Sequence, residues 1–396
     1  MTFDTDIFIS GAGLAGMMLA ARLSARGFSV IVCDPSTPPD GATVEGSDLR
    51  STAYLEPSCR VLEEAGVWDA LAPHATPLAA LQVIDSDGWP PTERARRTFQ
   101  PGDLGLDTFG RNIPNWRAHL SLMDVLKARE NVDLRLGVGF SDLVTRDDAA
   151  FVTLTDGTRL RARLVIGADG RNSPVRAAAG IDVTTRRYGQ KAFAFAVTHD
   201  LPHDDVSTEI YNSGGAFTTV PLVDHEGQPA SAIVWMNAAE RSRALAAAPA
   251  EDFAQVLNER SLGILGRMSP VSPIRSWPII TQTAHRVTAR RTVILAEAAH
   301  VLPPIGAQGL NTSIADIAAL SEVLGDDPGD AATLDRYARG RLRDMRLRAG
   351  AIDLFNRVCQ SGHPAVQATR RAGLAAVHDI APLRQRIMMA GMGGAA

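Results

Sequence analysis

The chain has 396 residues, which is enough to bury a sizeable core and to form two domains, or one domain with a large insertion. With 45% hydrophobic and 21% charged residues it has the composition of a globular protein, and its net charge of −4 gives no reason to expect a nucleic-acid partner. The three cysteines, Cys33, Cys59 and Cys359, are scattered and form no CxxC pair, so they predict neither a disulfide framework nor a zinc site.

An uncharged run near the start, from Ile7 to Ala21, resembles a signal peptide or a membrane anchor in composition. However, Asp4 and Asp6 precede it where a signal peptide carries positive charge. The run is also shorter than the ~20 residues that a membrane-spanning helix requires. We therefore expect a cytoplasmic protein.

The first 34 residues predict a β-α-β unit. Asp6–Ser10 is a short apolar strand, Leu14–Arg26 has the pattern of a helix, and Phe28–Cys33 is a second apolar strand. Such a unit implies parallel strands joined by a right-handed crossover.

A glycine-rich turn joins the first strand to the helix. In a GxGxxG motif the first glycine makes the tight turn, the second lets the backbone approach a pyrophosphate, and the third lets helix and strand pack closely. The N–H groups of the helix start then face the phosphates, and Asp34, at the end of the second strand, can accept hydrogen bonds from ribose hydroxyls. The carboxylate disfavours a 2′-phosphate, but the motif alone does not distinguish NAD from FAD. The predicted nucleotide loop comprises Gly11, Gly13, Leu14, Ala15 and Gly16.

The next elements are a helical stretch within residues 49–71, short strands and loops from Leu81 to Gln100, and a helix at Asn115–Ala128. A buried strand, Arg163–Ala168, ends in the turn Asp169-Gly170. Taken alone, that turn is better explained as an ordinary Asp-Gly turn than as part of a binding site.

The hydrophobic pattern changes between about Arg186 and Trp277, where alternating apolar runs predict an antiparallel sheet. Tyr211, Phe217 and Trp235 lie on its strands and are candidates for a substrate pocket. Aromatic residues on strands are more often plain core, and this alternative stays open.

After the sheet, Thr292–Leu295 is again a buried strand and Asn311–Leu324 a helix. The segment between them combines an acid at the strand exit, a Pro-Pro turn, two glycines and a helix start. Backbone N–H groups at such a start can hold the negative charge of a reduced flavin ring, and Glu297 can reach a sugar or ribityl hydroxyl. The segment contains Glu297, His300, Pro303, Pro304, Gly306, Gly309, Leu310 and Asn311.

A helical tail runs from about Asp330 to the end of the chain. Four of its arginines, mixed with Leu, Ile and Met, leave two alternatives open: contact with a membrane surface, or a tail packed on the body with solvated arginines, which we favour. The four are Arg370, Arg371, Arg384 and Arg386.

Three segments in this order, GAGLAG, RLVIGADGRNSPVR and AEAAHVLPPIGAQGLN, resemble the three fingerprints of single-component FAD-dependent aromatic hydroxylases of the para-hydroxybenzoate hydroxylase type. Within that group the chain is most similar to the ring hydroxylases of ubiquinone biosynthesis. The segment around Arg50, the segment IPNWRAHLSLMDVL and the C-terminal tail carry this second likeness, which covers essentially the whole chain.

The resemblance implies roles for individual residues. The loop glycines would hold the FAD pyrophosphate and Asp34 the adenosine ribose, while Glu297 would hold the ribityl chain. The family usually has Gly-Asp where this chain has Ala296-Glu297, so the carboxylate is one methylene farther from the backbone. The remaining contacts implied for the cofactor are Arg50 and Arg117 on the ribityl side, Asp169 and Gly170 near the nicotinamide groove, Pro303 on the substrate side of the ring, and Gly306, Gly309, Leu310 and Asn311 at the ring itself.

The same resemblance implies an α/β fold: a Rossmann-like FAD-binding domain of mixed β-α units, an inserted and mainly antiparallel substrate sheet, and a helical C-terminal tail. We assign residues 1–75, 105–181 and 278–396 to the FAD-binding domain, and residues 76–104 and 182–277 to the substrate domain.

The implied function is FAD-dependent hydroxylation of an electron-rich ring, a polyprenylated phenol of ubiquinone biosynthesis, through a flavin hydroperoxide. NADH or NADPH would be a transient reductant and O2 a co-substrate, and no metal ion is needed. The alternatives are a hydroxylase of a small aromatic acid, a flavoprotein reductase that inserts no oxygen, and a non-catalytic FAD-binding scaffold. The sequence identifies no acid or base that activates a phenol, and it leaves dimerisation, membrane contact and membership of a biosynthetic complex open.

Overall fold

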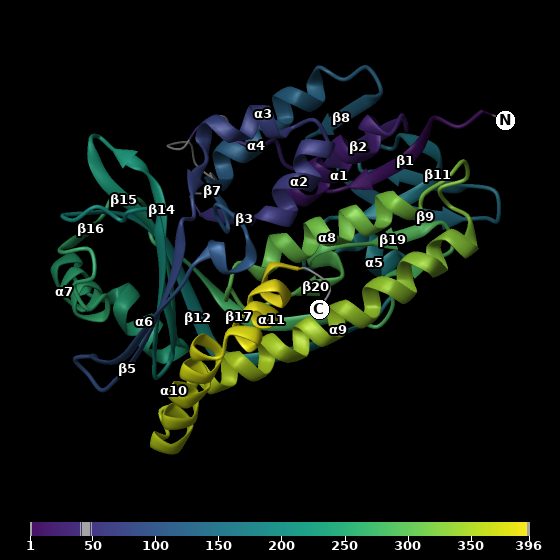
Figure 1. Ribbon diagram of the computed structural model, residues 1–396. Helices are drawn as coiled ribbons and strands as arrows, with labels where there is room; N and C mark the ends of the chain where they lie inside the picture. Colours follow the sequence, from purple (N-terminus) through teal and green to yellow (C-terminus); the bar gives the residue numbers. More distant parts are fainter. Residues whose placement is uncertain (1, 40, 42–47, 49, 394–396) are drawn as a thin grey trace.

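The computed structural model describes residues 2–39, 41, 48 and 50–393, which form three β-sheets with helices packed on them (Figure 1). The α/β class expected from the sequence is confirmed. Two of the sheets, one mainly parallel and one mainly antiparallel, carry most of the fold, and the functional cavity lies between them.

The mainly parallel sheet begins with the predicted β-α-β unit, β1 (Thr5–Ser10), α1 (Leu14–Ala25) and β2 (Val30–Asp34). β1 pairs in parallel with β2 on one side and with β11 (Arg159–Gly167) on the other. β19 (Thr292–Ile294) extends the sheet beside β11, and β8 (Val132–Leu136) extends it beside β2, both in parallel. Antiparallel strands complete it: β9 (Phe140–Thr145), β10 (Ala150–Leu154) and β18 (Thr288–Ala289).

The inner strands β1 and β2 and residues 164–167 of β11 are mainly apolar and buried, as strands covered on both faces are. α1 packs against α4 (Asn115–Lys127) and α8 (Gln308–Val323). The predicted stretch before residue 71 is two helices, α2 (Glu56–Glu64) and α3 (Trp68–Leu71), because Gly66 at φ +67° interrupts it. The smaller elements of this half are α5 (Pro174–Ala178), the sheet of β3 (Ser51–Leu55), β7 (Gly110–Pro114) and β4 (Thr76–Pro77), and the 3-10 turns η1 (Ala72–His74), η2 (Pro101–Leu104) and η3 (Ala296–Ala298).

The second large sheet has nine strands in the order β20-β17-β12-β15-β14-β13-β5-β6, with β16 beside β12. Neighbouring strands are antiparallel except that β13 and β5 are parallel. The strands are β5 (Ala80–Asp87), β6 (Thr92–Phe99), β12 (Val183–His199), β13 (Val206–Asn212), β14 (Gly215–His225), β15 (Gln228–Ala238), β16 (Met268–Pro270), β17 (Arg275–Ala284) and β20 (His300–Val301). β20 comes from the segment we assign to the FAD-binding domain, so the domain boundaries remain a proposal.

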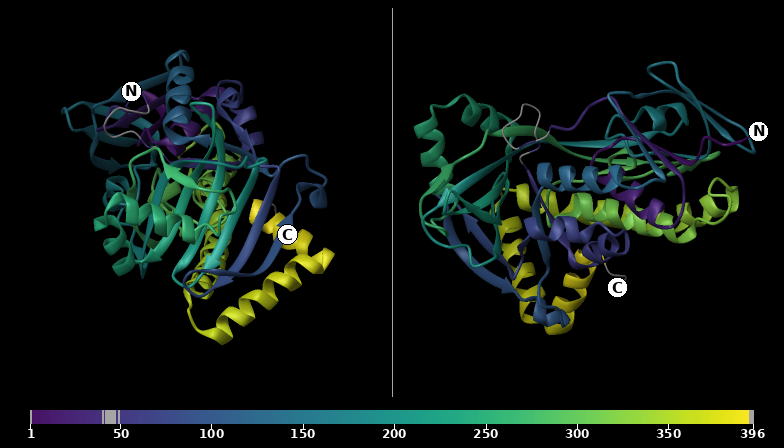
Figure 2. Two further views of the ribbon diagram at one scale, coloured as in Figure 1. Left: turned by 90° about the vertical axis from the view of Figure 1, so that its left-hand side faces the viewer. Right: turned by 90° about the horizontal axis from the view of Figure 1, so that it is seen from above.

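Helices cover both faces of the nine-stranded sheet (Figures 1 and 2). α6 (Ala239–Ala247) and α7 (Ala250–Arg260), which the sequence reading did not anticipate, pack on one face through Leu245, Phe253 and Leu257. The tail forms α9 (Ala331–Gln360), α10 (Pro364–Asp379) and α11 (Ala381–Met392), and it supplies Cys359 and Met388 to the opposite face.

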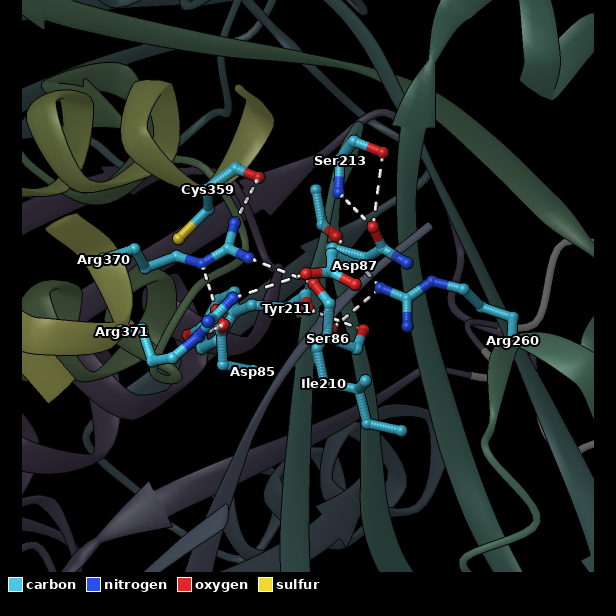
Figure 3. A network of polar contacts seen from close by, with 12 residues as sticks. Asp85, Ser86, Asp87, Ile210, Tyr211, Ser213, Arg260, Cys359, Arg370 and Arg371 are labelled. Atoms are coloured by element: carbon cyan, nitrogen blue, oxygen red, sulfur yellow. Dashed lines mark hydrogen bonds and ion pairs between the residues drawn. The ribbon is translucent and has the colours of Figure 1, made fainter. Parts of the chain in front are cut away.

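Three of the four tail arginines anchor these helices to the body, whereas Arg386 is exposed. Arg370 is 7% exposed, and its Nε lies 2.5 Å from Oδ1 of Asp85 on β5. Arg371 bonds the other oxygen of Asp85 at 3.1 Å, and Arg384 pairs with Asp103 at 2.7 Å. These contacts, several of them visible in Figure 3, support the packed-tail alternative, with the difference that Arg370 is buried rather than solvated. Among the described residues, no helix combines the length and apolar character needed to cross a bilayer.

Candidate active site

A cavity of about 1050 Å³ lies between the carboxyl ends of the parallel strands and one face of the nine-stranded sheet. Its volume is at the upper end of the roughly 300–1,000 Å³ typical of ligand pockets, so it can hold a cofactor together with a substrate. Most of the predicted cofactor residues line it: Gly11, Gly13, Leu14, Ala15, Asp34, Arg50, Asp169, Gly170, Glu297, Gly306, Gly309 and Leu310.

The glycine loop is shaped as the motif requires. A Cβ on Gly11, which has φ +105°, would lie 2.4 Å from the carbonyl oxygen of Ala168, and one on Gly16 would lie 1.9 Å from the carbonyl oxygen of Gly11. Gly13 is different, because a Cβ there would meet no protein atom within 4 Å. Gly11 and Gly16 therefore allow backbone packing, whereas Gly13 leaves open space on the side of the cavity.

Two helices begin at this cavity without a side-chain cap. The N-caps of α1 and α8 are Gly13 and Ala307, and neither helix has a capping hydrogen bond from a side chain. N–H groups in the first turn of both helices can therefore meet a ligand, apart from that of Gln308, which donates to the Ile305 carbonyl at 3.4 Å. Both helix dipoles favour negative charge there.

Two carboxylates stand at the ends of β2 and β11, the strands on either side of β1. Asp34 holds the glycine loop, because its Oδ2 accepts from the Ala12 N–H at 2.9 Å. Asp169 accepts from Ser10 Oγ and from the Val175 N–H, each at 3.1 Å. Burial raises the pKa of Asp169, while the hydrogen bonds to it partly offset the rise.

Ala296 of the Ala296-Glu297 pair, where the family usually has Gly-Asp, lies in a backbone conformation that favours glycine. Ala296 has φ +54°, in the left-handed region that favours glycine. Its N–H donates to Oδ2 of Asp316 at 3.2 Å, which fixes the strained turn, and the neighbouring Glu297 lines the cavity. Glycine at this position would adopt the same backbone conformation without strain.

Asp316 on α8 holds this turn through further contacts of its carboxylate. Its Oδ2 also contacts His300 Nε2 at 2.6 Å, and its Oδ1 accepts from Arg341 Nε at 2.8 Å and Nη2 at 2.7 Å. Burial by itself would raise the pKa of Asp316, but the charges and hydrogen bonds of His300 and Arg341 hold that pKa below its ordinary value. His300 therefore orders the loop through its contact with Asp316.

Arg50 lies on the opposite wall. It forms two 2.7 Å contacts with the carboxylate of Asp48 and stacks over Trp277, with 5.3 Å from the guanidinium carbon to the ring centroid. The bond to Asp48 is the main cause that raises the pKa of Arg50, and the charge of Glu297 adds to it.

Four predicted cofactor residues do not line the described cavity. Gly16 packs against Gly11, and Pro303 is buried beside Pro304, which does line the cavity. Asn311 bonds the backbone of Leu55, Ala53 and Ala307, so it supports the loop from behind. The guanidinium of Arg117 donates to Nε2 of His74 at 3.1 Å, while its neighbours Trp116 and His119 face the cavity.

Of the three aromatic candidates, Phe217 and Trp235 are fully buried, and Phe193 and Phe253 surround Trp235 at 6.1 and 5.9 Å between ring centroids. They face α6 and α7 rather than the cavity and therefore belong to the core, which is the alternative that the sequence left open. Tyr211 is on the other face.

Glu209 on β13 is a cavity residue that sequence reasoning missed. It is 8% exposed, and the hydroxyl of Tyr211, two residues later on the same face, donates to its carboxylate. The available signal was an acid at an inward position of the apolar run STEIY.

Two histidines, His199 and His203, have the HxxxH spacing of a zinc pair, which the sequence reading passed over. Their ring nitrogens are engaged elsewhere: His199 contacts the Leu201 carbonyl and Ser231, and His203 contacts the Leu222 carbonyl and the Asp205 N–H. Within the described residues, no group of three or more His, Cys, Asp or Glu could hold a metal ion.

The sequence model of the FAD binding domain matches residues 4–346, which is most of the chain and includes every residue that lines the cavity. The chain belongs to this FAD-dependent monooxygenase family. Among similar proteins, the ubiquinone hydroxylase UbiL of Rhodospirillum rubrum is 33% identical over 395 residues, which cover 98% of this chain and 89% of that protein. The 3-demethoxyubiquinol 3-hydroxylase of Escherichia coli K12 is 28% identical, and the alignment covers 98% of both chains.

The fold is shared with a solved structure, p-nitrophenol 4-monooxygenase PnpA from Pseudomonas putida, at a TM-score of 0.80 with full coverage of both chains and 18% identity. This family member is therefore an FAD-dependent enzyme with the fold of the aromatic monooxygenases. The open space at Gly13 and the two uncapped helix starts fit a dinucleotide with a negatively charged pyrophosphate and ring.

Proposed function

We propose that this monooxygenase hydroxylates a neutral, prenylated phenol, as the names of its relatives indicate for ubiquinone biosynthesis. One observation carries the substrate class: among the described residues, the nine-stranded sheet contributes no Arg or Lys to the cavity, and its one histidine there, His300, is bonded to Asp316. The cavity residues from the sheet are mainly apolar, with Glu209 as the single acid: Ala194, Phe195, Glu209, Thr218, Val220, Ala232, Ile233, Val234, Trp277, Pro278, Ile279, Ile280, His300 and Val301.

A small aromatic acid would need a partner for its carboxylate, because a buried charge is costly unless it is paired. Among the described residues, the one basic side chain that the sheet contributes to the cavity, His300, is already bonded to Asp316, and Glu209 would repel the carboxylate. An apolar tail, in contrast, gains about 25 cal/mol for each Å² of apolar surface removed from water. The lining therefore favours an uncharged phenol with an apolar substituent.

The geometry of the cavity supports an assignment of the cofactor residues. In our proposal the first amides of α1 and the space at Gly13 hold the FAD pyrophosphate, and Asp34 holds the adenosine ribose. Glu297 and Arg50 flank the ribityl chain, and the start of α8 meets the flavin ring. Bound FAD, reduced by NADH or NADPH, supplies the activation of O2, while the chain positions the phenol ring and excludes water.

The test is oxygen insertion. The purified protein, loaded with FAD, is supplied with NADH or NADPH and 2-farnesylphenol under ¹⁸O2, and the products are analysed by mass spectrometry. Label in a hydroxylated farnesylphenol supports the proposal. Label only in the product of 4-hydroxybenzoate would move the assignment to small aromatic acids, and reduction of the substrate without label would make the protein a reductase.

The Gly13→Ala variant tests whether oxygen insertion depends on a cofactor bound at this loop. Its extra methyl group meets no protein atom but occupies the space assigned to the pyrophosphate. We expect a folded protein that loses both flavin absorbance and oxygen insertion.

A further inference from the structure

The Glu209 side chain enters the cavity from β13 beside the loop assigned to the flavin ring. Its Oε1 accepts from the Gly306 N–H at 3.3 Å, and its Oε2 accepts from the Tyr211 hydroxyl. Both carboxylate oxygens thus receive a donor, which suits the ionised form, and each keeps a lone pair for a further hydrogen bond. The residue contacts the cavity directly, so a phenol bound there can reach it.

Charged side chains approach this pair from two elements: Arg370 on α10, and the buried Arg260 on α7, whose Nη2 donates to the Ile210 carbonyl at 2.8 Å. Tyr211 is 4% exposed and meets the edge of Phe355 on α9, with 5.4 Å between ring centroids and the rings 83° apart. The thiol of Cys359 on α9 and the guanidinium of Arg370 on α10 also influence Tyr211 electrostatically. Figure 3 shows Arg370 turned toward Asp85 on β5, with which it pairs.

Glu209 therefore has hydrogen-bond donors but, among the described residues, no ion-pair partner. Burial is the largest influence on its pKa and raises it, while the Tyr211 hydroxyl and the Gly306 N–H partly offset the rise. A carboxylate with a raised pKa takes up a proton near neutral pH more readily than an exposed one. Such groups gather at functional sites.

We propose that Glu209 is the base that accepts the hydroxyl proton of the phenol substrate, with Tyr211 as its positioning residue. This inference rests on the proposed function. In the step, the phenol O–H bond breaks, its proton forms an O–H bond on the Glu209 carboxylate, and the electron pair remains on the phenol oxygen. The ring becomes more electron-rich, so oxygen insertion into it is faster.

The Glu209→Gln variant separates this role from a structural one. Glutamine keeps an oxygen that accepts from the Gly306 N–H, but it cannot take up the proton. Positioned general bases contribute about 10²–10⁴-fold, so we expect turnover of 2-farnesylphenol at neutral pH to fall by at least ~100-fold. Activity should recover as the pH approaches ~10, where a phenol ionises without help. FAD affinity and the flavin spectrum should stay unchanged.

Two further variants test the role of Tyr211 and provide a control outside the cavity. In Tyr211→Phe, the carboxylate loses one donor that favours its charged form, so the acidic limb of the pH–rate profile should move to higher pH. Glu226→Gln, at the exposed turn between β14 and β15, changes the same chemical group outside the cavity and should leave the profile unchanged.

A second readout needs no substrate. Infrared difference spectra of the oxidised holoenzyme, wild type against Glu209→Gln, should show a carboxyl band that titrates above the ordinary glutamate range of about 4.3. A carboxyl that titrates in the ordinary range, or a variant with wild-type turnover at every pH, would overturn the inference. Loss of FAD from Glu209→Gln would also overturn it, since the role would then be to anchor the loop. A wild type that shows the titrating band but inserts no oxygen into any phenol refutes the proposed function instead, and the base role falls with it.

Discussion

The Asp316 cluster offers the sharpest test of how the site is held together. Asp316→Asn keeps the shape of the side chain but removes the charge that faces both His300 and Arg341. The side chains of Asp316 and Arg341 are 3% and 11% exposed, so the guanidinium would remain buried without its main partner. Breaking a buried pair in this way costs about 3–5 kcal/mol. Arg341 keeps a second contact with Asp344 at 2.9 Å, so we expect the low end, about 3 kcal/mol.

The assay is urea unfolding of the cofactor-free protein, followed by tryptophan fluorescence. The matched control is Asp344→Asn, which removes the more exposed partner of the same arginine and should cost about 1 kcal/mol or less. Because the turn at Ala296 donates to Asp316, the Asp316→Asn variant should also bind FAD more weakly, whereas the control should not.

The pH dependence has a defined sign. The pKa of Asp316 is lower in the folded chain than in the unfolded one, so its stabilisation is complete above the unfolded value of about 3.9 and is lost as the pH falls through the folded pKa. The gap in unfolding free energy between wild type and Asp316→Asn should therefore shrink as the pH falls below about 4. Equal costs for the two variants would refute the cluster as the anchor of the site.

Three other predictions follow from the same geometry. Ala296→Gly should raise the free energy of unfolding by about 0.5–1 kcal/mol in a urea titration, because the left-handed alanine costs roughly 1–2 kcal/mol and the freedom of glycine in the unfolded chain returns part of it. Gly11→Ala should cost about 2–5 kcal/mol by strain and overlap, whereas Gly13→Ala should cost about 1 kcal/mol or less and still abolish FAD binding, as calorimetry can show; equal stability losses would contradict the assignment of the two glycines. Asp85→Asn leaves Arg370 buried without its partner, so α10 should detach and the tail should become sensitive to limited proteolysis; a resistant tail would show that packing alone holds it.

Much of the fold was accessible from the sequence because its signals are local. The order strand, glycine turn, helix and strand predicts β1, α1 and β2 within a few residues, and the parallel pairing of β1 and β2 confirms the unit. The change to alternating runs after Arg186 likewise predicts the antiparallel sheet. The same alternating pattern does not predict the helices α6 and α7, which lie within that region.

What the sequence could not supply is which side chains face each other across the chain. Glu209 and Gly306 are 97 positions apart, and no local pattern predicts that the acid of one strand receives the amide of a distant loop. Phe217 and Trp235 show the converse case. Their strands were predicted correctly, but the face of the sheet that each one occupies depends on where α6 and α7 dock.

The last turn of α11 lies against the start of α8. Gln308 Nε2 donates to the carbonyl of Gly391 at 2.7 Å, and Arg348 contacts both Gln308 and the Ala390 carbonyl. The strands beside β1 likewise come from residues 159–167 and 292–294. During synthesis, the full set of strands that pack beside the N-terminal glycine loop is therefore made only after most of the chain has been translated. A fragment that ends before β19 has the fingerprint but lacks one strand of the sheet that carries the site.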